Sequence, residues 1–275
     1  MNNIKLVFPK IYKVLQIINR FRIDLTHVKI NYHDLSEFFN YYKFGVRLSS
    51  NNNRFFSNFF NHIVVDSGLN ICVIDVGAND GWFAKTVFRF ARLARVISYE
   101  PLLSQHKYLD QILQKNKNFN WIGKAVGDKN ELISITEYGT TGLSSIKGIN
   151  ADYSYSSHYN QSVTTQYEVE STILDNEFKG FIFNNEVEYI LKIDTQGYEL
   201  EVLRGAYTLL KNNKFNWIII EVMTVSKYSN SALYDEIFNY LHSLNYKLWD
   251  INPSYYEEKS NRLTEFDVIF TLEKS

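Results

Sequence analysis

The feature that most constrains this chain is the segment at residues 71–81, which reads ICVIDVGANDG. A short apolar run ends in the acid Asp75 and is followed by a turn that contains Gly77 and Gly81. An apolar and basic stretch with a helical pattern comes next, and a second apolar run then ends in Glu100. A strand, a glycine turn, a helix and a second strand with a terminal acid form the layout of a nucleotide-type cofactor site. An enzyme is therefore the leading hypothesis.

The rest of the chain repeats this alternation of strands and helices. The predicted strands are apolar runs at residues 71–76, 96–100, 120–125, 189–193 and 217–222. The predicted helices cover residues 82–94, 104–115, 198–211 and 232–244. This order predicts an α/β fold with a doubly wound, mostly parallel sheet. Gly205 lies inside the third helix, where glycine costs about 1 kcal/mol relative to alanine, so we expect it to pack closely against a neighbour.

The alternation is interrupted at residues 128–187, where we expect an insertion. Residues 131–138 and 163–171 alternate like edge strands, and residues 140–161 are polar and rich in Tyr and Ser. A long polar stretch inside a compact enzyme is typical of a substrate-binding lid. Its aromatic side chains can stack on sugar rings or cover the sheet edge; they are Tyr153, Tyr155 and Tyr159.

Near its end the chain predicts two further strands, at residues 246–250 and 265–272, joined by an irregular loop that holds Pro253. We assign residues 71–275 to this main domain and residues 1–70 to an N-terminal helical extension. The 275 residues, 45% of them hydrophobic, are enough for one packed domain with an appendage.

The N-terminal extension begins with a basic amphipathic pattern. Residues 1–30 carry six Lys or Arg and one acid, Asp24, and apolar residues recur at helical spacing within residues 11–21. Such a helix packs on a domain or a second subunit, or lies on an anionic membrane surface; packing is the more common case. Residues 51–53 are expected to be a loop, and residues 55–62 a short helix.

Composition limits the location and the partners. The net charge of −1 gives no field that favours nucleic acid, and we expect no nucleic-acid partner. The single cysteine, Cys72, cannot form an internal disulfide. No apolar run approaches the roughly 20 residues that span a bilayer, and the first residues do not read as a signal peptide. We expect a cytoplasmic protein, with residues 1–25 as a candidate contact to the inner face of the membrane and a homo-oligomer left open.

Two acids in the glycine turn indicate the kind of cofactor. Asp75 and Asp80 would repel a pyrophosphate, and the glycine spacing is G-x-x-x-G rather than the G-x-G-x-x-G of dinucleotide sites. S-adenosylmethionine has a sulfonium and an ammonium group and no phosphate, so it suits such a turn. Glu100, at the tip of the second strand, is placed to accept hydrogen bonds from two ribose hydroxyls.

Four segments together resemble the FkbM family of S-adenosylmethionine-dependent methyltransferases. These segments are residues 75–81, 99–101, 125–128 and 191–206. The resemblance covers roughly residues 70–272, including residues 172–175 and 267–270, and leaves residues 1–70 uncovered. Gln196 is a departure, because family members usually have Glu there.

The resemblance implies a class I methyltransferase fold of seven strands, the last one antiparallel, and O-methylation of a hydroxyl, commonly on a sugar. It places the methionine part of the cofactor at the turn and the ribose at Glu100. It places the adenine near Lys124, Ala125 and Asp128, with Trp121 as a weaker candidate. The full set of cofactor-binding candidates is Asp75, Gly77, Ala78, Asn79, Asp80, Gly81, Glu100, Pro101, Lys124, Ala125, Asp128 and Ser145.

Methyl transfer to a sugar hydroxyl is helped by a general base. Asp194 ends the fourth core strand, at the edge where open α/β sheets bind ligands, and is our first choice for a base or an orienting group. Lys192 can reach the site or pair with a carboxylate, and Glu221 can contact substrate. Asp194 and Glu221 are a weak signal for a divalent metal, since hard cations want several oxygens, so we assign no metal ligands. His158 is a candidate mobile base, although a surface histidine is the more common case.

The leading functional hypothesis is a sugar O-methyltransferase that acts on a polysaccharide or glycoconjugate precursor. Its substrate class comes from the resemblance. An NAD-dependent nucleotide-sugar dehydrogenase or epimerase is an alternative that the glycine spacing disfavours. A non-catalytic assembly partner that keeps the fold is a third hypothesis.

Overall fold

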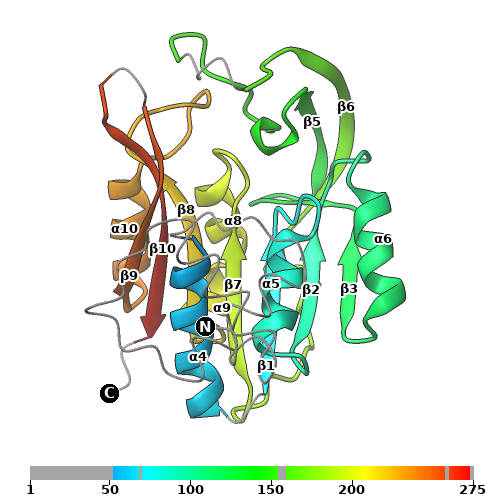
Figure 1. Cartoon of the computed structure of the whole chain (residues 1–275), viewed down its shortest axis with the longest axis vertical. Coiled ribbons are helices and arrows are strands. Elements are labelled where there is room, and N and C mark those ends of the chain that lie inside the picture. Colours follow the sequence, from blue (N-terminus) through cyan, green and yellow to red (C-terminus); the bar gives the residue numbers. More distant parts are fainter. Residues whose placement is uncertain (1–51, 68–69, 154–158, 258–259, 273–275) are drawn as a thin grey trace, which may run out of the picture. The chain divides into compact units, whose positions relative to one another are not determined.

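The computed structural model describes residues 52–67, 70–153, 159–257 and 260–272 (Figure 1). The sheets and helices below belong to one compact unit, Ser50–Ser275. The helix predicted within residues 11–21, Tyr155 and His158 lie outside the described residues. The predicted membrane contact of residues 1–25 therefore stays a prediction.

The centre of the fold is a seven-stranded sheet with the order β3-β2-β1-β7-β8-β10-β9. Its parallel core consists of β1 (Ile71–Val76), β2 (Arg95–Tyr99), β3 (Phe119–Ile122), β7 (Glu188–Ile193) and β8 (Trp217–Met223). β10 (Leu263–Leu272) runs antiparallel to both β8 and the edge strand β9 (Tyr246–Tyr256). The predicted α/β class, with seven strands and an antiparallel last strand, is confirmed.

Helices cover both faces of this sheet because its strands are apolar on both sides. Val73 packs with one hydrophobic cluster, while its neighbours Cys72 and Ile74 pack with another. The helices that contribute to the first cluster are α4 (Asn52–Ser67), α5 (Trp82–Phe90) and α6 (His106–Lys115). Those that contribute to the second are α7 (Leu174–Glu177), α8 (Glu199–Gly205), α9 (Tyr207–Lys211) and α10 (Tyr234–Ser243).

The insertion forms a second sheet of three strands, with the order β4-β6-β5. Its strands are β4 (Ala125–Val126), β5 (Glu131–Tyr138) and β6 (Val163–Thr172). A short 3-10 helix, η1 (Thr141–Leu143), follows β5. Figure 1 shows β5, β6 and this helix beyond the carboxyl ends of the parallel strands. The insertion therefore covers the carboxyl-end edge of the main sheet, which is where α/β folds bind ligands.

The phenylalanine-rich helix α4 is part of the core. Phe56, Phe60 and Ile63 are buried in the same cluster as Val73 of β1. The helix predicted at residues 55–62 is confirmed, but the loop predicted at residues 51–53 is wrong for Asn52 and Asn53, because α4 begins at Asn52. Among the described residues, no helix combines the length and the apolar character needed to cross a membrane.

Three other predicted elements differ from the structure. The strand predicted at residues 120–125 ends at Ile122, because Ala125 pairs with Ser171 of β6 in the small sheet. The predicted loop around Pro253 is instead part of β9. Proline is tolerated there because β9 is an edge strand and its pairing with β10 is irregular next to Pro253.

The helix predicted at residues 198–211 is broken at Ala206 into α8 and α9. The carboxylate of Asp175 explains the new start, since it accepts hydrogen bonds from the amides of Thr208 and Leu209, at 2.8 and 3.0 Å. Gly205 packs as predicted: a Cβ atom there would lie 1.9 Å from the carbonyl oxygen of Gly127. This contact holds α8 against the loop after β4.

Candidate active site

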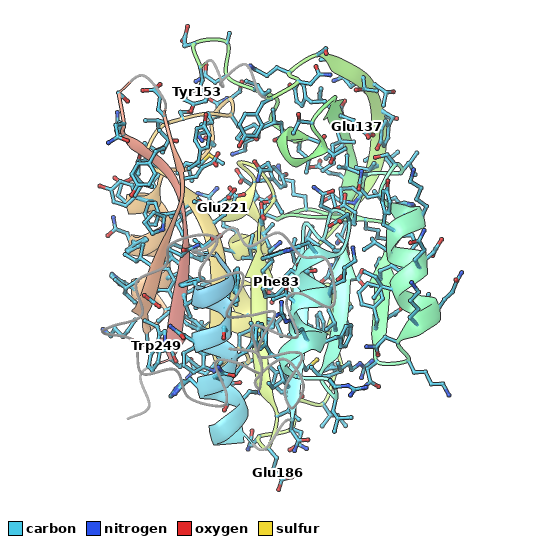
Figure 2. The ribbon with its side chains drawn as sticks, viewed as in Figure 1. Phe83, Glu137, Tyr153, Glu186, Glu221 and Trp249 are labelled. Atoms are coloured by element: carbon cyan, nitrogen blue, oxygen red, sulfur yellow. The ribbon has the colours of Figure 1, made fainter. Side chains whose placement is uncertain are left out.

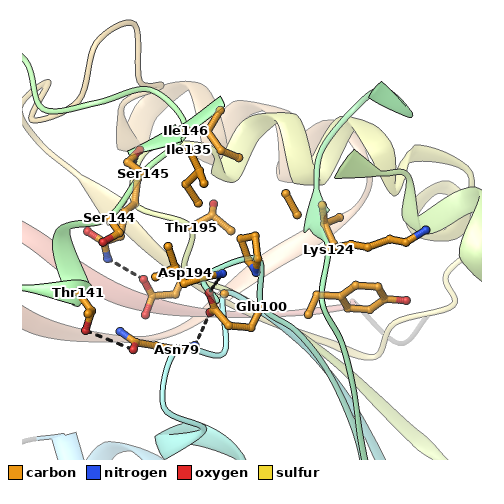
Figure 3. A pocket seen from close by; sticks show the side chains of 18 residues that line it. Asn79, Glu100, Lys124, Ile135, Thr141, Ser144, Ser145, Ile146, Asp194 and Thr195 are labelled. Carbon is orange, nitrogen blue, oxygen red and sulfur yellow. Dashed lines mark hydrogen bonds between the residues drawn. The ribbon is translucent and has the colours of Figure 1, made fainter. Parts of the chain in front are cut away.

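A pocket opens where the carboxyl ends of β1, β2 and β7 meet the insertion (Figure 3). The predicted site residues in its wall are Gly77, Asn79, Glu100, Pro101, Lys124, Ala125, Ser145 and Asp194. The wall also contains Tyr99, Ile135, Thr141, Ser144, Thr195 and Gln196. In Figure 3, Lys124 extends toward one end of the pocket, and Thr141, Ser144 and Ser145 lie toward the other.

The turn after β1 forms the floor of the pocket. Gly77 has a φ of +79°, and a Cβ atom there would lie 1.8 Å from the carbonyl oxygen of Asp194. The amides of Gly77 and Ala78 both donate to the carbonyl oxygen of Tyr99, at 3.0 and 3.2 Å. Only glycine fits this position, so the turn places bare backbone at the pocket as predicted.

Glu100 is buried at the end of β2 and lines the pocket. One carboxylate oxygen accepts a hydrogen bond from the amide of Leu102 at 2.8 Å, and the other accepts one from the amide of Asn79. Burial raises the pKa of Glu100 to about 7, although these two hydrogen bonds act against the increase. The carboxyl group therefore changes charge near neutral pH.

Asp75 lies beneath the turn and is completely buried. It stands in a row across three strands, because Ser98 and Lys192 are its register partners on β2 and β7. Ser98 Oγ donates to Asp75 Oδ2 at 3.0 Å, and Lys192 Nζ lies 3.4 Å from Asp75 Oδ1. Burial raises the pKa of Asp75, and Lys192 opposes this increase. Asp75 thus belongs to a buried row of polar side chains next to the turn and is not in the pocket wall.

Lys192 ties this buried row to the pocket. Its Nζ donates to the carbonyl oxygen of Gly77 at 3.1 Å and lies 3.5 Å from Asp194 Oδ2. Burial disfavours its charged form, yet Asp194 and Asp75 raise the pKa of Lys192 above its ordinary value. The side chain is therefore a cation that holds the turn and Asp194 in place.

Asp194 follows β7 and lies in the pocket wall. Its Oδ1 accepts a hydrogen bond from Gln196 Nε2 at 2.7 Å, while its Oδ2 faces Lys192. Both oxygens are thus held from the protein side. A carboxylate fixed in this way at a ligand pocket can accept a proton or orient a hydroxyl group.

Glu221, near the carboxyl end of β8, is linked to this group through the same amide (Figure 2). Gln196 Nε2 donates to Glu221 Oε2 at 2.8 Å. Burial raises the pKa of Glu221 well above its ordinary range, and the Asp194 carboxylate adds to the increase. The Nε2 group of Gln196 therefore lies between the carboxyl groups of Asp194 and Glu221, in the place that a bridging cation would take. Among the described residues, no His, Cys, Asp and Glu side chains form a metal-binding group of three or more.

Besides Asp75, Lys192 and Glu221, four further predicted residues of the described chain lie outside the pocket wall. Asp80 accepts a hydrogen bond at 2.9 Å from the amide of Trp82, the first residue of α5. Ala78 and Gly81 belong to the turn, where Gly81 contacts Ile112 and Leu109 of α6 through its Cα side. Asp128 is absent from the wall.

Only some of the residues predicted to lie near adenine line the pocket. Lys124 lines the pocket, and its Nζ pairs with Glu170 Oε2 at 3.0 Å. Trp121 is not in the wall: its ring packs on His106 with the centroids 4.5 Å apart, and its Nε1 donates to Asp110 at 3.1 Å. The structure thus brings together Lys124 and Ala125 at this end and leaves Trp121 outside.

The turn after β7 is shaped by Glu199, a residue that was not among the predicted site residues. Glu199 is buried, and its carboxylate accepts hydrogen bonds from the amides of Thr195 and Gly197, at 2.9 and 3.0 Å. Burial raises the pKa of Glu199 to about 7 against these hydrogen bonds. Its position in the family-like segment at residues 191–206 was a signal that could have identified it.

Two further acids beside Glu221 were also missed. Asp267 of β10 is the cross-strand partner of Glu221, and burial raises its pKa to about 7. Glu265 Oε1 pairs with Lys227 Nζ at 2.6 Å, and this ammonium lies 4.2 Å from the ring centre of Tyr255. Residues 267–270 are part of the family resemblance, but only the strand order shows that they lie beside β8.

Comparisons with known proteins decide the family. The Methyltransferase FkbM domain matches residues 75–248. The chain belongs to the FkbM methyltransferase family. No curated protein matches the chain.

Solved structures with a similar fold are distant from this FkbM methyltransferase domain. The rRNA methylase of Streptococcus thermophilus has a TM-score of 0.42 and 12% identity, over 82% of this chain and 100% of that one. The N-methyltransferase NodS of Bradyrhizobium japonicum WM9, in complex with S-adenosyl-L-homocysteine, has a TM-score of 0.42 and 9% identity, over 83% and 91%. Fibrillarin of Aeropyrum pernix, with natively bound S-adenosyl-L-methionine, has a TM-score of 0.39 and 9% identity, over 74% and 66%.

The pocket of this FkbM domain fits the predicted cofactor, S-adenosylmethionine. Gly77 lies in the pocket wall in close backbone contact with Asp194, and Glu100 presents a carboxyl group at the tip of β2. Glu100, the predicted ribose contact, lines this pocket together with Asn79 and Lys124. S-adenosylmethionine is the cofactor of the family, and it supplies an electrophilic methyl group on a sulfonium sulfur when bound.

Proposed function

We propose that this protein is an O-methyltransferase that methylates a hydroxyl group of a sugar in a polysaccharide or glycoconjugate precursor. The observation that carries the proposal is Asp194, a carboxylate in the pocket wall that is held at both oxygens by Gln196 and Lys192. A base in a fixed orientation suits a hydroxyl acceptor, because an unactivated hydroxyl is a poor nucleophile.

The proposed reaction needs one proton acceptor on the protein, because the acceptor hydroxyl loses its proton when it is methylated. The hydroxyl oxygen forms a bond to the methyl carbon, the carbon–sulfur bond breaks with its electron pair on sulfur, and the hydroxyl proton passes to Asp194. Lys192 and Gln196 keep the carboxylate oriented while it receives the proton. The insertion restricts the entry of water, because Ser144, Ser145 and Ile146 form one side of the pocket.

The sugar class rests on the family resemblance, and the aromatic residues of the insertion do not add to it. The Tyr159 ring lies 5.7 Å from the Tyr255 ring, and the Tyr153 ring lies 5.3 Å from the ammonium of Lys227. These contacts favour a covering role for both rings in the described structure.

Calorimetric titration with S-adenosylmethionine and with NAD is the first test, and we expect binding of S-adenosylmethionine alone. A panel of neutral, amino and acidic sugar acceptors is then incubated with the protein and cofactor, and mass spectrometry reports the gain of one methyl group. Binding of NAD alone would contradict the assignment. Cofactor binding without methylation of any acceptor would instead favour a non-catalytic assembly partner.

A further inference from the structure

The side-chain amide of Gln196 joins Asp194, in the pocket wall, to Glu221 of β8. Its Nε2 donates to Asp194 Oδ1 at 2.7 Å and to Glu221 Oε2 at 2.8 Å. Its Oε1 accepts a hydrogen bond from the hydroxyl of Tyr228 at 2.7 Å. Both N–H groups and the carbonyl oxygen of this amide therefore have a partner on the protein.

The surrounding groups fix the orientation of this amide. A flipped amide would turn Oε1 toward two carboxyl oxygens, so the observed orientation is the one that pairs each donor with an acceptor. The backbone is held as well, because Gln196 has a φ of +56° and its carbonyl oxygen accepts a hydrogen bond from Ser145 Oγ at 2.6 Å. A Cβ atom on Gly197 would lie 2.7 Å from Tyr228 Cβ, which shows how closely this turn packs on Tyr228.

A carboxylate at position 196 could not make the same contacts. An oxygen in the place of Nε2 would face the oxygens of Asp194 and Glu221 at hydrogen-bond distance. Like charges so close together require a shared proton or a cation between them. The amide supplies two N–H donors at this point and carries no charge. This is where the chain departs from the glutamate usual in the family.

We propose that Gln196 is a positioning residue for methyl transfer: its amide holds Asp194 and Glu221 together in fixed orientations, without the proton or cation that a carboxylate there would need. Gln196 acts through Asp194, which lines the pocket and is held on its other oxygen by Lys192. The inference rests on the proposed function and adds a residue to it.

Charged and titratable groups from several elements face this arrangement. They are Asp75 on β1, Lys192 on β7, Glu199 on α8, Glu265 and Asp267 on β10, and Lys227 and Tyr228 after β8. Both lysines already pair with carboxylates: Lys192 with Asp75 and Asp194, and Lys227 with Glu265. A third carboxylate at position 196 would therefore add to an excess of negative charge.

The test compares two variants. Gln196→Glu keeps the shape of the side chain and removes its N–H donors, and Gln196→Met removes the N–H donors and the carbonyl acceptor. Gln114→Glu is the matched control, because Gln114 is exposed on α6 and makes the same chemical change away from the pocket. The first measurement needs no acceptor: carbon-13 NMR follows the titration of the side-chain carboxyl groups, assigned with Asp194→Asn and Glu221→Gln. We expect Gln196→Glu to raise the titration midpoint of Glu221 further, by about one pH unit or more, and Gln114→Glu to leave it unchanged.

The second measurement is methyl transfer as a function of pH. We expect kcat of Gln196→Glu and Gln196→Met to fall by about 10- to 100-fold, with the Kd for S-adenosylmethionine within about threefold of the unsubstituted protein. The pH–rate profile of Gln196→Glu should move to higher pH, which a loss of packing alone would not cause. An unchanged titration and an unchanged profile in an active enzyme would overturn this inference while leaving the proposed function intact. Shifted midpoints in a protein that methylates no acceptor would instead contradict the proposed function.

Discussion

A Cβ atom on Gly77 would lie 1.8 Å from the carbonyl oxygen of Asp194. The turn after β1 and the residue that follows β7 therefore contact each other through their backbones. A hydrogen bond from the amide of Asp194 to the carbonyl oxygen of Val76, at 3.0 Å, holds the same junction. The cofactor turn and the candidate base are thus built as one unit, and a change in one displaces the other.

The first prediction concerns this junction. Gly77→Ala should abolish binding of S-adenosylmethionine or prevent folding, because the new methyl group must displace the backbone of Asp194. Gly180→Ala is the matched control, since Gly180 has a similar φ of +82° and no heavy atom within 4 Å of its Cβ position. We expect it to cost about 1–2 kcal/mol from backbone strain and to leave cofactor affinity unchanged. Calorimetry and chemical unfolding measure both quantities.

Equal losses in the two alanine variants would contradict this explanation. They would show that the positive φ, and not the contact with Asp194, sets the requirement for glycine at position 77. A normal cofactor affinity in Gly77→Ala would show that the two turns can separate without harm.

The second prediction concerns the charge of Glu100. The carboxylate must be deprotonated to accept hydrogen bonds from two ribose hydroxyls, and burial raises its pKa to about 7. Affinity for S-adenosylmethionine should therefore fall as the pH drops below about 7. Glu100→Gln should weaken binding by about tenfold or more at pH 8, since a hydrogen bond to a charged group contributes about 1.5–3 kcal/mol, and should lose this pH dependence.

Titration calorimetry between pH 6 and pH 9 checks this expectation. Glu168→Gln serves as a control because Glu168 is an exposed residue of β6. If the affinity of Glu100→Gln kept the same dependence on pH, another group would be responsible for it.

Much of the fold could be predicted from the sequence because the strands and turns are encoded locally. The apolar run at residues 71–76 matches β1 at both ends, and the alternating pattern at residues 131–138 matches β5. The break at Ala206 could not be predicted in this way, because it depends on the side chain of Asp175 from a distant segment. The inclusion of Pro253 in β9 likewise depends on that strand lying at the sheet edge.

The site was predictable where a residue type and a strand end sufficed. Glu100 and Asp194 each follow a strand, and both line the pocket. Asp75 also lies near a strand end, but the sequence does not reveal that its side chain points into a buried row with Lys192. Tyr228 and Asp267 became visible only through the strand order and the loop after β8, which bring them to Gln196 and Glu221.

The third prediction separates chemistry from binding. Asp194→Asn keeps the shape of the side chain and removes its ability to accept a proton. Cofactor affinity should change by less than about threefold, while kcat should fall by about 100-fold or more, as expected for loss of a general base. Single-turnover measurements with an excess of enzyme report the chemical step. An Asp194→Asn enzyme with normal kcat would eliminate Asp194 as the base and leave Glu221 as the candidate.

The fourth prediction concerns stability and pH. Burial raises the pKa of Asp267 to about 7, so between about pH 4 and pH 7 the folded state binds a proton there that the unfolded state has released. Stability must therefore fall as the pH rises through this range, by about 1.4 kcal/mol per pH unit for each such proton. Asp267→Asn has no titratable group at this position, so the folded state no longer takes up this proton. The new side chain can still accept the hydrogen bond from Asn252. Urea unfolding at pH 5, 6 and 7 should give a shallower decline for the variant, whereas identical slopes would mean that Asp267 ionises normally in the folded protein.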